Sequence, residues 1–104
     1  MSSGYVAVLV VDVHFPEAGS LKGKRKELSS LKTQLRQRLH CAVAETAHQD
    51  LWQRAELTVA VTAGSAAGVE AAADGVERWL EERLPQGVSV ERHVRSVEDL
   101  RGGE

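Results

Sequence analysis

The sequence predicts one α+β domain in which two helices cover one face of a four-stranded antiparallel sheet. Three observations lead to this prediction. Four short segments have the apolar composition or the alternation of β-strands. Two longer segments repeat apolar residues every three or four positions, as amphipathic helices do. Their order along the chain is βαββαβ, which is the split-βαβ order of a ferredoxin-like sandwich.

The first half of the chain supplies a strand, a helix and a second strand. Residues 5–13 (YVAVLVVDV) are mostly β-branched and apolar, which is typical of a strand central in its sheet. A helix is expected over residues 21–40, although Gly23 is a poor helix former and predicts a start one or two residues later. Residues 41–47 form the second expected strand. The buried stripe of the helix consists of Leu28, Leu31, Leu35 and Leu39.

The second half supplies a third strand, a second helix and a fourth strand. Residues 54–62 (RAELTVAVT) alternate between apolar and polar positions, so one face of this strand is core. Ser65 is the expected N-cap of the second helix, which ends at Pro85. The fourth strand is expected over residues 88–94, where Val88, Val90, Arg92 and Val94 alternate. The stripe of the second helix consists of Val69, Ala73, Val76, Leu80 and Leu84.

Length and composition set the class of protein. The 104 residues suffice for one domain, expected over residues 1–95, with a loose tail over residues 96–104. Cys41 is the sole cysteine, so no internal disulfide can form, and a reducing cytoplasm is expected. No apolar run approaches the roughly 20 residues that span a bilayer, and we expect no membrane partner. The formal net charge of −2 argues against a protein that coats nucleic acid over its whole surface.

Basic residues concentrate in the first helix. Seven of the thirteen Lys and Arg residues lie between Lys22 and Arg38, beside one acid, Glu27. Cations at the beginning of a helix are unfavourable unless an anion neutralises them, because that end already carries partial positive charge and free N–H groups. Phosphate is the anion that such an end binds best. The candidate phosphate-binding residues are Lys22, Lys24, Arg25, Lys26, Lys32 and Arg36.

The second helix carries an acidic stripe, and the two charged helix faces could neutralise each other. Right-handed crossovers argue against this, because they place the first helix over the third strand and the second helix over the first strand. The stripes then point to opposite edges of the sheet, and the basic face needs a partner elsewhere. The acidic stripe consists of Glu70, Asp74, Glu77 and Glu81.

Two polar pairs follow strands. Asp12 and His14 leave the first strand on one side, and His48 and Asp50 repeat that spacing in another loop. Such groups could act as acid and base or as metal ligands, or they could fix their loops by local hydrogen bonds. Trp52 lies at the entry to the third strand and could stack a base or cover the edge of the sheet. We predict neither a resident metal nor a cofactor.

The open face of the sheet excludes one mode of RNA binding. RNA-recognition sheets carry aromatic residues on their central strands, whereas this sheet offers Val8, Val10, Thr58 and Ala60. These small residues leave a mildly apolar face that a second copy could cover, and symmetric homodimers are the commonest oligomers.

Three stretches resemble the YlxP-like family, an uncharacterised bacterial group carried as a domain of unknown function. They are residues 11–16 (VDVHFP), 20–25 (SLKGKR) and 44–55 (AETAHQDLWQRA), and the similarity extends over about residues 4–95. The resemblance implies a ferredoxin-like α/β sandwich. Through the family's usual gene neighbours, it also implies an association with transcription, translation initiation and ribosome maturation. It carries over no catalytic residue.

Three functions stay open. The first is a non-enzymatic protein that holds phosphates of RNA or of a ribosomal particle on the first helix. The second is an interaction module that forms a homodimer through the open sheet face. The third is a small-molecule or metal enzyme around the polar cluster Asp12, His14, His48 and Asp50.

Overall fold

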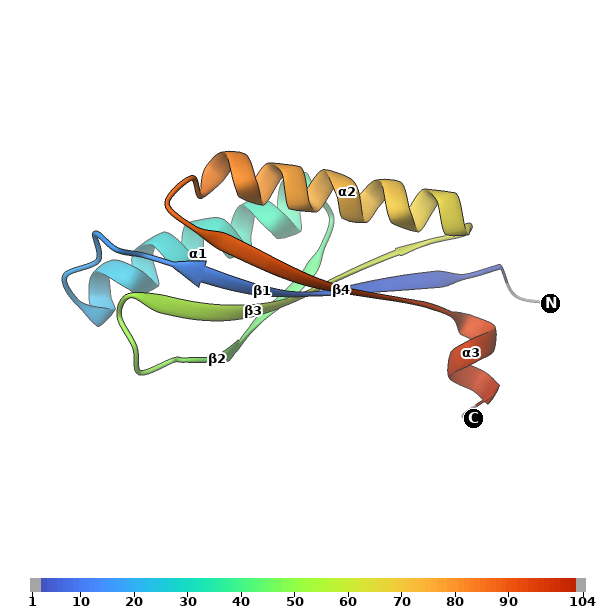
Figure 1. Cartoon of the computed structure of the whole chain (residues 1–104), viewed down its shortest axis with the longest axis horizontal. Helices are drawn as coiled ribbons and strands as arrows, with labels where there is room; N and C mark the ends of the chain where they lie inside the picture. Colours follow the sequence, from blue (N-terminus) through green and yellow to red (C-terminus); the bar gives the residue numbers. More distant parts are fainter. Residues whose placement is uncertain (1–2, 103–104) are drawn as a thin grey trace.

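The computed structural model describes residues 3–102 and confirms the predicted ferredoxin-like sandwich. Helices α1 and α2 lie on one side of a twisted four-stranded sheet, and the opposite side of the sheet carries no long helix (Figure 1). The elements, in chain order, are β1 (Tyr5–His14), α1 (Leu21–Arg38), β2 (Ala42–Ala47), β3 (Arg54–Ala63), α2 (Ala66–Arg83), β4 (Val88–Ser96) and α3 (Val97–Gly102).

The sheet has the order β2-β3-β1-β4, and every neighbouring pair is antiparallel. The most apolar strand, β1, lies in the interior of the sheet, where it pairs with β3 along one edge and with β4 along the other. Several register rows run across all four strands, and in one of them His93 lies opposite Val8, Val8 opposite Ala60 and Ala60 opposite Ala42. The edge strands are β2 and β4.

Serine caps set the beginning of both long helices. The Ser20 hydroxyl accepts a hydrogen bond from the Gly23 amide at 3.1 Å, and the Ser65 hydroxyl accepts one from the Gly68 amide at 3.0 Å. The cap at Ser65 was expected. The late start predicted for the first helix was wrong, because the Ser20 cap binds the amide of Gly23 itself and holds the first turn together.

The core lies between the helices and the sheet. Alternate residues of β1 and β3 are buried against the leucine stripe of α1 and the aliphatic stripe of α2, as predicted. Among residues 3–102, Lys24 is the one charged side chain buried with them, and it is 1% exposed. The largest apolar members are Leu9, Leu35, Leu57, Leu80, Val11, Val13, Val59, Val69 and Val76.

A short helix replaces the start of the expected loose tail. The Val97 amide donates to the Gly4 carbonyl at 2.8 Å, which ties α3 to the beginning of β1. Ser96 and Asp99 form a capping box, in which the Ser96 hydroxyl accepts from the Asp99 amide at 3.0 Å. That Ser-x-x-Asp signal was present in the sequence. Residues 103–104 of the expected tail lie outside the described residues. Within residues 3–102, no helix is long and apolar enough to cross a membrane.

Candidate nucleic-acid interface

Lys24 is not available to a phosphate, so its assignment as a phosphate-binding residue is corrected. Its side chain turns inward beside the leucine stripe, and Nζ donates to the carbonyls of His48 at 2.7 Å and Leu51 at 2.6 Å. It also lies 3.2 Å from Glu45 Oε2, an ion pair without a well-directed hydrogen bond. A buried ammonium needs such partners, because an unpaired buried charge is very costly. Lys24 therefore anchors the β2–β3 loop to α1.

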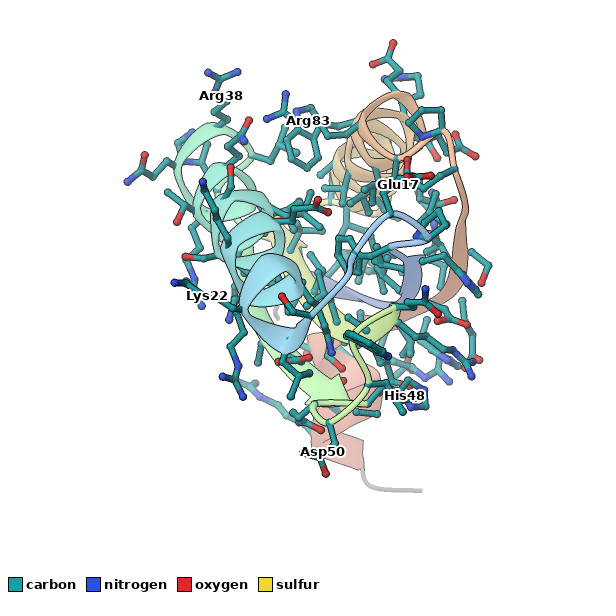
Figure 2. All side chains as sticks on the ribbon, turned by 90° about the vertical axis from the view of Figure 1, so that its left-hand side faces the viewer. Glu17, Lys22, Arg38, His48, Asp50 and Arg83 are labelled. Atoms are coloured by element: carbon teal, nitrogen blue, oxygen red, sulfur yellow. The ribbon has the colours of Figure 1, made fainter. Side chains whose placement is uncertain are left out.

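The remaining predicted cations stay at the surface of α1. We call Lys22, Arg25, Lys26, Lys32 and Arg36 the basic face. Lys22 points away from α2 (Figure 2). Within residues 3–102, no ion pair involves any member of the basic face. The first turn of α1 contains no acidic side chain, so the helix dipole adds to this positive charge.

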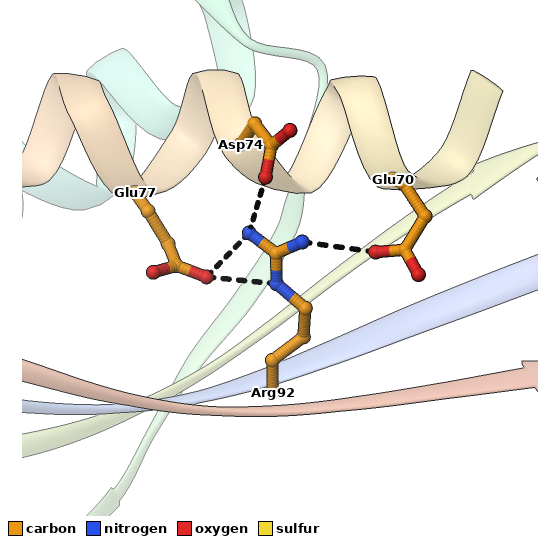
Figure 3. A network of polar contacts seen from close by, with 4 residues as sticks. All are labelled: Glu70, Asp74, Glu77 and Arg92. Atoms are coloured by element: carbon orange, nitrogen blue, oxygen red, sulfur yellow. Dashed lines mark hydrogen bonds and ion pairs between the residues drawn. The ribbon is translucent and has the colours of Figure 1, made fainter. Parts of the chain in front are cut away.

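The acidic stripe of α2 is bound by Arg92 of β4. One guanidinium reaches three carboxylates, with contacts of 2.8 Å to Asp74, 2.9 Å to Glu70 and 2.6 Å to Glu77 (Figure 3). The hydrogen bond to Asp74 is the largest of several that raise the pKa of Arg92 above its ordinary value. Three of the four acids of the stripe therefore share one cation inside the chain, and that cation comes from a strand and not from α1.

The two charged helix faces lie toward opposite edges of the sheet. Contacts of α1 are chiefly with β2, and not with β3 as the handedness argument expected. Lys24 holds the β2–β3 loop, and the Arg36 guanidinium donates to the Val43 carbonyl of β2 at 2.9 Å. These bonds draw α1 toward the β2 edge, while Arg92 draws the acidic stripe toward β4. Arg36 thereby also protects a free sheet edge.

A groove separates α1 from α2 beside the basic face. It has a volume of about 490 Å³, with Phe15, Leu31 and Leu84 at its lining and Lys26 and Arg83 among its polar residues. Its other lining residues are Gly23, Glu27, Ser30 and Gln34. An acid and two cations share this groove, so its charge does not by itself select a ligand.

The polar cluster predicted from Asp12, His14, His48 and Asp50 assembles only in part. Asp12 forms a two-bond pair with Arg54, at 3.0 Å to Nε and 2.9 Å to Nη2, and this hydrogen bonding lowers the pKa of Asp12. Asp12 and His48 line a hollow of about 290 Å³ on the open sheet face, whose lining includes neither His14 nor Asp50. Among residues 3–102, no three His, Cys, Asp or Glu side chains gather to hold a metal.

The other two residues of the predicted polar cluster are His14, at the end of β1, and Asp50, in the β2–β3 loop. The His14 amide donates to the Gly87 carbonyl at 3.2 Å, so the backbone at His14 fixes the turn before β4. Asp50 is exposed in the β2–β3 loop, below His48 in Figure 2. A hydrogen bond that fixes a turn, one of the two interpretations of this cluster, describes the His14 backbone, whereas Asp12 is held by an ion pair between β1 and Arg54.

Trp52 lies in the same loop and is 49% exposed, next to Leu51 at 46%. The turn therefore presents two large apolar side chains at the surface. Trp52 precedes β3, which begins at Arg54, by two residues, as expected for a position at the entry to this strand.

Sequence reasoning missed the roles of Arg92 and Arg54. Arg92 shares the alternation of Val88, Val90 and Val94, and an arginine in the inward phase of a strand was a usable signal. Pairing of Arg54 with Asp12 depends on the register of β1 against β3, which no local pattern contains. For Lys24 a signal existed, because it stands four residues before Leu28 on the buried stripe.

The fold and these surfaces define a small α+β domain whose exposed features are a basic helix face and an open sheet face. The chain belongs to the family described as protein of unknown function (DUF503), whose model matches residues 6–95. No curated protein matches the chain.

Proposed function

We propose that the protein is a non-enzymatic binding protein that holds phosphate groups of RNA on the basic face of α1. The observation that carries the proposal is the division of charge. Arg92 pairs with three acids of α2, Glu70, Asp74 and Glu77, whereas the basic face has no ion-pair partner within residues 3–102. The unpaired cations are therefore free to neutralise an external polyanion.

The spacing of the basic face suits an extended anion better than a single ion. From Lys22 to Arg36 the helix rises about 20 Å, a length over which a nucleic-acid strand presents several phosphates. Phosphate contacts of this kind position a nucleic acid without reading its sequence. The resemblance to the YlxP-like family, with its ribosome-associated gene neighbours, favours RNA, either free or in a ribosomal particle.

The experiment is a salt titration of RNA binding. A labelled RNA hairpin is titrated with wild-type protein by fluorescence anisotropy at potassium chloride concentrations from low to physiological. We expect affinity to fall as salt rises, by close to one unit of log–log slope for each phosphate contact. The double change Lys22→Glu with Arg25→Glu should weaken binding at least tenfold and flatten the slope.

The matched control reverses two cations outside the basic face, Arg78→Glu with Arg101→Glu, both exposed. It changes net charge by the same amount and should bind nearly as the wild type does. Equal affinity and equal slope in the Lys22 and Arg25 variant and in the wild type would reject the basic face as the site.

A second candidate function is an interaction module that pairs with its own copy through the open sheet face. The observation that favours it is the row of half-buried valines, Val6, Val8 and Val10, on the side of the sheet opposite α1 and α2. Sedimentation velocity of wild type and Val10→Glu tests this candidate. A dimer closed by this face should dissociate when a carboxylate is placed in its centre.

A further inference from the structure

The open sheet face has a regular composition that the strand register makes visible. The central row consists of His93, Val8, Ala60 and Ala42. The row two residues toward the end of β1 consists of Glu91, Val10, Thr58 and Ala44. The row two residues toward the start of β1 consists of Arg95, Val6 and Thr62.

The two flanking rows match each other by type. On β4 a carboxylate stands at one side of the central row and a guanidinium at the other, Glu91 and Arg95. On β1 both positions are valine, and on β3 both are threonine. Such a face is complementary to itself once it is turned end for end, because on β4 a carboxylate then meets a guanidinium, on β1 valine meets valine and on β3 threonine meets threonine. Ala44 has no counterpart, since β2 begins at Ala42.

We infer that two copies of this chain pack their open faces about a two-fold axis that runs across the strands along the central row. This inference rests on the second candidate function and adds its geometry. The axis brings Arg95 of each copy over Glu91 of the other, valine over valine and threonine over threonine. Aligned packing of two sheets at a separation of about 10 Å is a common arrangement.

The alternative two-fold axis, running along the strands, is disfavoured by charge. Between β1 and β3 it would place Asp12 of one copy over Glu56 of the other, since these two residues are register partners. Arg54 offsets the charge of Asp12, but Glu56 has no ion-pair partner within residues 3–102, so a second carboxylate facing it counts against this axis. The axis across the strands avoids that contact.

The contacts that Arg95 and Glu91 make within the chain do not prevent them from pairing across the dimer. The Arg95 guanidinium donates to the carbonyl of its neighbour Val94 at 2.8 Å, and no ion pair within residues 3–102 includes it. Glu91 contacts His93 beside it on the same strand. Both side chains are exposed, so each can reach a second copy.

The exposed apolar residues lie at the two ends of the same face. The β2–β3 loop with Leu51 and Trp52 extends below the sheet at one end, and α3, with Leu100 60% exposed, extends below it at the other (Figure 1). Rotation about the axis across the strands brings the end with the β2–β3 loop in one copy next to the end with α3 in the other. These projections would then flank the paired sheets and enlarge the buried area.

Charge exchange at one pair tests the inference. Dimer dissociation constants are measured by sedimentation equilibrium for wild type, Arg95→Glu, Glu91→Arg and the double variant carrying both changes. Each single change places like charges opposite each other twice per dimer and should raise the dissociation constant at least tenfold. The double variant restores opposite charges and should return it to within about threefold of wild type.

Controls separate the failure of this geometry from the failure of the second candidate function. Arg78→Glu, on the outside of α2, should leave the dissociation constant unchanged. If Val10→Glu dissociates the dimer while the charge exchange has no effect, the face is an interface but the axis is wrong. A wild-type chain that stays monomeric at several hundred micromolar would overturn both. Circular dichroism of each variant checks folding, which exposed edge-strand charges should not impair.

Discussion

Lys24 Nζ lies 3.2 Å from Glu45 Oε2 and also binds the carbonyls of His48 and Leu51. A residue that the sequence places in a basic surface is in fact a buried connection between α1, β2 and the β2–β3 loop. Two of its neighbours in sequence, Arg25 and Lys26, remain exposed. One of three consecutive basic residues is therefore a structural member of the core, while the other two stay at the surface.

Replacement of Lys24 by methionine should reduce the free energy of unfolding by about 3 kcal/mol, because Glu45 and two carbonyls lose their partner inside the protein. Urea denaturation measures the change. The matched control Lys26→Met, on the exposed face, should alter stability by less than about 0.5 kcal/mol. If the Lys24 variant were as stable as wild type but bound RNA less tightly, Lys24 would be a ligand contact after all.

Arg92→Met should destabilise the protein by about 1–2 kcal/mol, since Glu70, Asp74 and Glu77 would face one another without a cation. The loss stays modest because Glu70 and Asp74 are more than half exposed and solvent screens their repulsion. Added salt should narrow the difference between variant and wild type in thermal unfolding. Arg92→Lys should recover only part of the loss, as an ammonium cannot reproduce the planar guanidinium fork. A difference that grows with salt would contradict this account.

Acidification should remove the stabilising contribution of Asp12. Arg54 lowers the pKa of Asp12 from its ordinary value of 3.8, so the folded protein holds the carboxylate more strongly than the unfolded chain does. The contribution is fully present above about that value and disappears as pH falls through the lower pKa of the folded state. Urea denaturation of wild type and Asp12→Asn at pH 7 and pH 2.5 should show a difference that shrinks at the lower pH. A difference that grows on acidification would mean that Asp12 is not ion-paired in solution.

Gly87 and Gly75 should respond in opposite directions to substitution by alanine. Gly87 has φ of +148°, a conformation that other residues rarely adopt, and Gly87→Ala should cost about 1–2 kcal/mol. Gly75 lies within α2, and a Cβ added there meets nothing within 4 Å. Gly75→Ala should stabilise the helix by about 0.5–1 kcal/mol. Differential scanning calorimetry of both variants gives the two signs, and equal signs would contradict the assigned backbone geometry.

Elements with a local signature were predictable from the sequence. The alternation in residues 54–62 and the repeat of Leu28, Leu31 and Leu35 identify a strand and a helix, because periods of 2 and 3.6 are properties of the local backbone. The Ser65 cap is equally local. The short helix α3 was missed although its Ser-x-x-Asp box was present, since so few residues carry little periodicity.

The candidate site was predictable only as a concentration of charge. The sequence determined that α1 is basic and that α2 is acidic on one side, because composition and helical spacing suffice for this. Tertiary structure decided that Lys24 is buried, that Arg92 takes the acids of α2 and that Asp12 meets Arg54, 42 residues away. Local spacing indicated the inward direction of Lys24 and Arg92, but their partners depend on strand order, register and the position of α1 over β2, which bring distant residues together. The same register decided which residues of the open face lie opposite one another, because only paired strands turn a sequence of alternating side chains into rows.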